Sequence, residues 1–114
     1  MNYEFGEVIL HNKNHTKTKK RITLKVDEVG YELLSVFVSS ELKNFYELVV
    51  RELTQVINGE EESSELALNR CELIINKEKC IIKDLLGEEP EDDVEIETEL
   101  LMKIIDEWHI KINT

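Results

Sequence analysis

The chain has 114 residues, of which 34% are charged and 41% hydrophobic, and its formal net charge is −11. A chain of this length forms a single domain, residues 1–114, whose modest core needs neither a metal nor a disulfide to fold. The acidic excess disfavours binding to nucleic-acid phosphates and to anionic membrane surfaces, and it favours a basic protein partner.

Two further properties bear on location and polarity. No apolar run approaches the roughly 20 residues of a membrane span, and the acidic N-terminal residues lack the basic region of a signal peptide, so we expect a cytoplasmic protein. Residues 1–21 carry five basic and two acidic residues, a net charge of +3, whereas residues 22–114 carry nine basic and 23 acidic residues, a net charge of −14. The sequence therefore predicts an electrically polarised molecule.

The first segment predicts a hairpin. Residues 3–10 favour a strand by composition, with Gly6 marking a bulge. Residues 11–20 are polar and predict the loop at its tip. Residues 21–27 alternate between apolar and polar side chains, the pattern of a half-buried strand.

The next segment holds an ambiguous run and a helix. Residues 31–39 are compatible with a third strand or a short helix, and their β-branched and aromatic content favours a strand. Residues 45–58 place apolar side chains on one helical stripe. Asn44 is expected to cap the N-terminus of this helix together with Glu47, and Gly59 to end it.

The most apolar strand-like stretch is NRCELIINKEKCIIKDLL, which predicts a second hairpin of residues 69–76 and 79–86. A turn at Lys77 and Glu78 sets the register so that Ile75 faces Cys80. The side chains on the predicted core face are Cys71, Leu73, Ile75, Cys80 and Ile82.

The same register predicts the state of both cysteines and the side chains on the opposite face of the hairpin. Cys71 lies roughly 13 Å from Cys80 along the ladder, too far for a disulfide, so we expect two free thiols that act as small core hydrophobes. Ile74 and Ile81 share the opposite face with charged side chains. They form either a plain cross-strand pair or part of an interaction surface.

The C-terminal segment completes the fold. Residues 87–93 predict a loop, a short strand follows at Val94 and Ile96, and Thr98 is expected to cap a helix over residues 99–112. The pattern as a whole predicts an α+β fold: a mainly antiparallel, twisted sheet of four to six strands with two principal helices packed on one face.

Motifs for chemistry are missing from the sequence. His11 and His15 lie in a polar, lysine-rich loop, the cysteines have no zinc spacing with His109, and there is no glycine-rich phosphate loop. Carboxylates are abundant, but none stands alone within an apolar run, where burial would raise its pKa. We therefore predict no catalytic site, no cofactor and no metal, and a protein that is not an enzyme.

Two dense acidic loops are the candidate binding residues, because acidic patches speed the encounter with a basic partner. The predicted partner-binding residues are Glu60, Glu61, Glu62, Glu88, Glu89, Glu91, Asp92 and Asp93.

Three segments carry a resemblance: the opening MNYEF, the central NRCELIINKEKCIIKDLL and the closing IIDEWHIKI. Together they resemble small acidic bacterial proteins, namely YacL-like small proteins and the immunity proteins of contact-dependent growth inhibition and related polymorphic toxin systems. The resemblance implies a non-catalytic protein that binds and neutralises a cognate toxin domain, often a nuclease.

A second hypothesis is a small structural or regulatory module. It would act through self-association, at a sheet edge or at the face of Ile74 and Ile81, or through another protein partner. The sequence leaves open whether the chain is a monomer or a homodimer.

Overall fold

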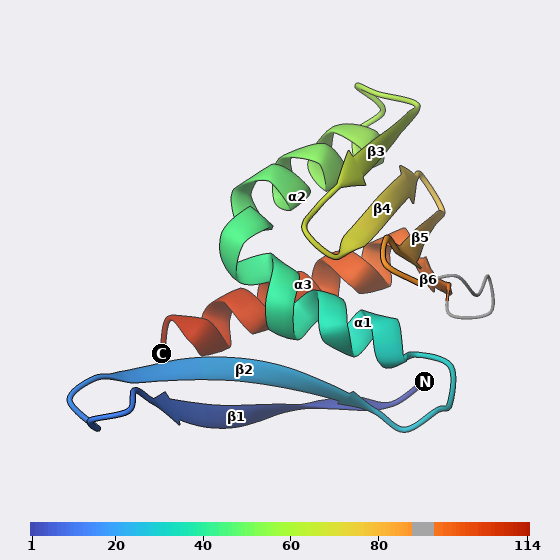
Figure 1. Cartoon of the computed structure of the whole chain (residues 1–114). Coiled ribbons are helices and arrows are strands. Elements are labelled where there is room, and N and C mark those ends of the chain that lie inside the picture. The colour runs from blue at the N-terminus through green and yellow to red at the C-terminus, as the bar shows by residue number, and fades with distance from the viewer. Residues whose placement is uncertain (88–92) are drawn as a thin grey trace.

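The computed structural model describes residues 1–87 and 93–114. They form an α+β arrangement of three layers, in which helices lie between a two-stranded and a four-stranded antiparallel sheet (Figure 1). The predicted fold class is confirmed. The strands divide between two sheets, however, so the helical layer is covered on both sides.

The first sheet is a long hairpin of β1 (Tyr3–His11) and β2 (Thr18–Val26). The two strands pair over their whole length, so the connecting loop is shorter than the predicted 11–20. Strand β2 faces the helices, and its alternating residues Ile22 and Leu24 are buried. The predicted half-buried strand is therefore confirmed.

Gly6 does not mark a bulge, because the β1–β2 register runs through it without interruption. Its role is close approach. A β-carbon at this position would lie 2.8 Å from Thr23 Oγ1 on the neighbouring strand, closer than atoms of this kind can approach.

One continuous helical run follows, made of α1 (Glu32–Val36), a π-helical turn η1 (Phe37–Glu41) and α2 (Leu42–Ile57). It changes direction between α1 and α2 (Figure 1). The preference for a strand over residues 31–39 is wrong. This segment lies between the two sheets and is buried at Leu34 and Phe37, so its composition reflects burial and not strand structure.

The predicted start of the second helix is also wrong, because η1 runs directly into α2 and leaves Asn44 exposed within the helix and not at its N-cap. The predicted end is confirmed. Helix α2 stops at Ile57, and Gly59 has a φ of 79°, a left-handed conformation that costs glycine little.

The four-stranded sheet contains β3 (Ser63–Ala67), β4 (Cys71–Asn76), β5 (Lys79–Asp84) and β6 (Val94–Glu97), in that order. The predicted β4–β5 register is confirmed, with Ile75 opposite Cys80. Strand β6 confirms the short strand predicted around Val94 and Ile96. Strand β3 was not predicted, because its residues SSELA show no apolar alternation.

Helix α3 (Thr98–Ile112) packs with α2 against the inner face of this sheet. The predicted cap at Thr98 is wrong. Its side chain is buried and the hydroxyl donates to the Asn76 carbonyl at 2.6 Å, so the residue anchors α3 to the end of β4. The same hydroxyl lies 3.3 Å from Cys80 Sγ.

A buried carboxylate joins the helical run to the sheet. Glu41, the last residue of η1, is 1% exposed, and its two oxygens accept backbone hydrogen bonds from Asn69 at 3.2 Å and Arg70 at 2.7 Å. These two residues form the turn between β3 and β4. The sequence did not single out Glu41, which lies in a polar stretch; in the fold its oxygens satisfy two donors of a tight turn.

Replacing Glu41 tests this contact. Glu41→Gln should lower the free energy of unfolding by about 2 kcal/mol, because an amide offers one acceptor where the carboxylate offers two. Urea unfolding followed by circular dichroism measures the change. The matched control is Glu47→Gln, an exposed position on α2 that should change stability by less than about 0.5 kcal/mol. Equal effects of the two substitutions would contradict the role given to Glu41.

Candidate protein-binding surface

The face of the four-stranded sheet that points away from α2 and α3 is the candidate surface. Neighbouring residues along a strand point to opposite sides, so the buried residues of β4 and β5 define the inner face and their neighbours the outer one. We call the following residues the outer face: Ser63, Glu65, Ala67, Glu72, Ile74, Asn76, Lys79, Ile81, Lys83, Glu95 and Glu97.

An apolar pair occupies the centre of the outer face. The register places Ile74 directly opposite Ile81, and both side chains are partly exposed. Glu65 lies opposite Ile74 on the β3 side, and Glu95 lies opposite Ile81 on the β6 side. One row across four strands therefore reads glutamate, isoleucine, isoleucine, glutamate.

The outer face is acidic, with four glutamates against two lysines among its residues. Lys79 forms a salt bridge within the outer face, since its Nζ lies 3.0 Å from Glu95 Oε1. The hydrogen bond and the charge of Glu95 raise the pKa of Lys79, so this lysine stays cationic. Lys83 lies opposite Glu72 in the next row.

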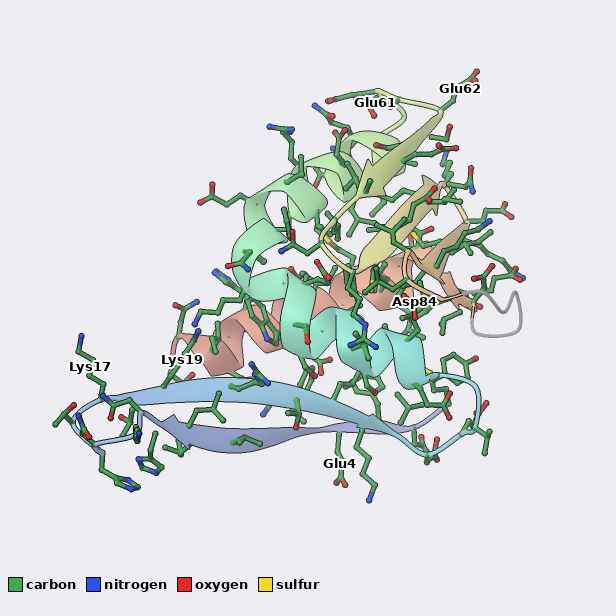
Figure 2. All side chains as sticks on the ribbon, in the orientation of Figure 1. Glu4, Lys17, Lys19, Glu61, Glu62 and Asp84 are labelled. Atoms are coloured by element: carbon green, nitrogen blue, oxygen red, sulfur yellow. The ribbon has the colours of Figure 1, made fainter. Side chains whose placement is uncertain are left out.

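The first acidic loop, Glu60 to Glu62, leads directly into β3 and so lies at one end of the outer face. Figure 2 shows Glu61 and Glu62 far from the β1–β2 hairpin. The structure separates the roles of its members. Glu61 is partly buried, and the Gln55 amide, with its nitrogen turned towards it, donates to Glu61 Oε1 at 2.8 Å. Glu60 and Glu62 are exposed.

The second acidic loop falls mostly beyond what the structure describes. Glu88, Glu89, Glu91 and Asp92 lie outside the described residues. Asp93 is half-buried and directly precedes β6. The structure does not bring the two loops together: Glu60 and Glu62 precede β3 at one end of the sheet, and Asp93 precedes β6 at the opposite end.

Sequence reasoning missed the glutamates of the outer face itself. The signal was present in VEIE, where Glu95 and Glu97 alternate with Val94 and Ile96, but their neighbours across the sheet depend on β6 pairing with β5. Glu65 was missed because β3 has no apolar alternation of its own.

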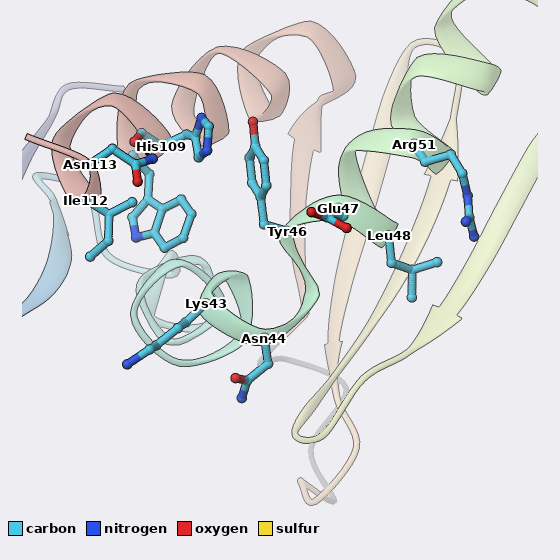
Figure 3. Close-up of a pocket in the computed structure, with 10 residues that line it drawn as sticks. Lys43, Asn44, Tyr46, Glu47, Leu48, Arg51, His109, Ile112 and Asn113 are labelled. Carbon is cyan, nitrogen blue, oxygen red and sulfur yellow. Dashed lines mark hydrogen bonds between the residues drawn. The ribbon is translucent and has the colours of Figure 1, made fainter.

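A groove lies between α2 and α3, with a volume of about 810 Å³ (Figure 3). The rings of Tyr46 and His109 stack across it with centroids 4.1 Å apart and planes 11° apart. Burial, and then the charge of Asp106, raises the pKa of Tyr46, so its hydroxyl stays protonated. The stack places the His109 ring against the neutral ring of Tyr46.

Over residues 1–87 and 93–114, three or more histidine, cysteine, aspartate or glutamate side chains nowhere gather in an arrangement suited to a metal ion. Within these ranges, no helix has the length and apolar character needed to cross a membrane.

Both thiols are free and buried on the inner face of the sheet. Burial, and then the charges of Glu41 and Asp84, raises the pKa of Cys71 to about 12. Burial also raises the pKa of Cys80, although the Thr98 hydroxyl opposes this. Both sulfurs are therefore protonated near neutral pH, and a protonated thiol is a weak nucleophile.

Comparison with known proteins adds no family: no protein-family model, no curated protein and no solved structure matches the chain.

The raised thiol pKa predicts a loss of stability at high pH. The ordinary pKa is 9.0 and the folded value about 12, so above pH 9 the unfolded chain releases the Cys71 proton while the folded chain holds it. Unfolding thus becomes easier as pH rises from 9 towards 12, by about 1.4 kcal/mol at pH 10. Denaturant unfolding at pH 7 and pH 10 should show this loss in the wild type and a smaller loss in Cys71→Ala. Identical pH dependence in the two proteins would contradict it.

Proposed function

We propose that this chain is a non-catalytic, immunity-type protein that binds and neutralises a basic toxin domain through the outer face of its four-stranded sheet. The observation that supports the proposal is the row Glu65, Ile74, Ile81 and Glu95, in which an uncovered apolar pair lies between carboxylates. An apolar centre with a charged surround is the composition of protein-binding surfaces.

Charge defines the kind of partner. The carboxylates of the outer face, with Glu60 and Glu62 at its end, attract a basic surface and speed its approach. A nuclease active site is such a surface, because it binds phosphates, and carboxylates can take the place of those phosphates. The apolar pair then supplies the contact that holds the complex once it has formed.

Self-association through the same face is the alternative, and the charges disfavour it. In a two-fold symmetric dimer the same patch meets itself. The excess of glutamates over lysines would then oppose an equal excess on the second copy, and like charges across an interface destabilise it. A partner with opposite charge has no such cost.

Binding to the product of the neighbouring upstream gene tests the proposal. Calorimetry at low ionic strength should show a one-to-one complex that weakens as salt is added. The double variant Ile74→Ser with Ile81→Ser should raise the dissociation constant at least about tenfold, because both positions lie at the centre of the surface. Circular dichroism confirms that the variant is folded.

The matched control is Glu4→Gln with Glu7→Gln, two exposed glutamates on β1, outside the outer face. This variant should leave the dissociation constant within about twofold. Glu65→Gln with Glu95→Gln should instead slow association and reduce its salt dependence. Failure to bind any toxin-like neighbour would overturn the proposal. So would a homodimer, seen as a doubled mass in light scattering, that the double variant Ile74→Ser with Ile81→Ser converts to a monomer.

A further inference from the structure

A small groove at the other end of the molecule concentrates positive charge in this acidic protein. It has a volume of about 160 Å³ and lies where β2, η1, α2 and α3 meet. Four cationic side chains line it: Lys19, Lys20 and Arg21 from β2, and Lys43 from the first turn of α2. Lys19 lies near the C-terminal end of α3, well away from Glu61 and Glu62 (Figure 2).

Within the part of the chain that the structure describes, one of these cations has an anionic or carbonyl partner and three do not. Lys20 donates to the Thr114 carbonyl at 3.0 Å. The ion pairs found within residues 1–87 and 93–114 are Met1 with Glu28 and Lys79 with Glu95. In these two ranges, therefore, no carboxylate lies within 4.0 Å of a charged nitrogen of Lys19, Arg21 or Lys43.

The three free cations act on one another. The close approach of Lys19 lowers the pKa of Lys43, and the charge of Arg21 adds to the effect. The fold thus holds like charges together at the mouth of a groove, and an anion bound between them would relieve their repulsion. The exposed Ser40 and Asn44 line the same groove and offer neutral donors.

We propose that this groove binds the phosphoryl group of a phosphorylated small molecule. Arg21 supplies a planar guanidinium that can donate two hydrogen bonds to one phosphate, while Lys19 and Lys43 add charge from the two sides. The groove, with a volume of about 160 Å³, admits a tetrahedral oxyanion.

The remainder of the ligand has a place as well. The basic groove shares Lys43, Asn44, Trp108 and Ile112 with the larger groove between α2 and α3. A molecule with its phosphate on the cations therefore extends along that groove towards Tyr46 and His109 (Figure 3). A nucleotide fits this description, because it joins a phosphate to a larger group that could lie along the α2–α3 groove. A long nucleic acid is disfavoured, because beyond the groove its phosphates would meet a chain of net charge −11.

Calorimetry at low ionic strength tests the site with two probes, tripolyphosphate and ATP. Each should bind saturably with one site per chain. Arg21→Gln with Lys43→Gln should weaken both at least tenfold. The matched control, Lys13→Gln with Lys25→Gln, removes two exposed lysines of the same hairpin outside the groove and should change affinity less than twofold. In the wild type, the amide NMR signals of Lys19, Ser40 and Lys43 should shift on titration.

Several outcomes would overturn the inference. They are an absence of saturable binding by both probes, equal weakening by the control variant, and NMR shifts confined to other residues. Tighter binding of a single-stranded oligonucleotide than of ATP would overturn the proposal of a small ligand and indicate a polynucleotide instead. Tighter binding of ATP than of tripolyphosphate supports contact along the α2–α3 groove, and equal affinity would overturn that part. None of these results depends on the outer face of the sheet.

Discussion

The contact between the Glu41 carboxylate and the backbone of Asn69 and Arg70 is the constraint on which the rest of the structure depends. It fixes the end of η1 against the β3–β4 turn, and so sets how the helical run lies on the four-stranded sheet. Without this carboxylate, the backbone N–H groups of Asn69 and Arg70 would lose the charged acceptor that they have in the fold, which lowers stability. Once this end is fixed, α2 covers the inner face and leaves Ile74 and Ile81 on the uncovered one.

The sequence predicted the β4–β5 hairpin well because all its information is local. The alternation of apolar residues and a two-residue turn are enough to set the register that places Ile75 opposite Cys80. The same register separates the inner face from the outer one, so the central apolar pair of the candidate surface could be named. The glutamates beside it could not, because they come from β3 and β6, whose pairing is a tertiary property.

The helical run shows the opposite case. Residues 31–39 lie between two sheets, and burial on several sides selects the apolar residues that also favour strands. Glu41 resembles any surface glutamate in the sequence, because its hydrogen-bond partners lie 28 and 29 residues further along the chain. The basic groove could be predicted only in part. The excess of lysine before residue 22 is visible in the sequence, but only the fold shows that Lys43 lies beside these cations.

The π-helical turn η1 has a consequence for how the chain tolerates insertions and deletions. A π-turn accommodates one more residue than an α-helical turn does. If the same residues formed a regular α-helix instead, everything beyond η1 would be rotated by about 100° around the axis. Leu42, Val49 and Leu53, all fully buried, would then leave the core together. The π-turn therefore takes up one additional residue while α2 keeps facing the core, and a regular α-helical turn in its place would need one residue fewer.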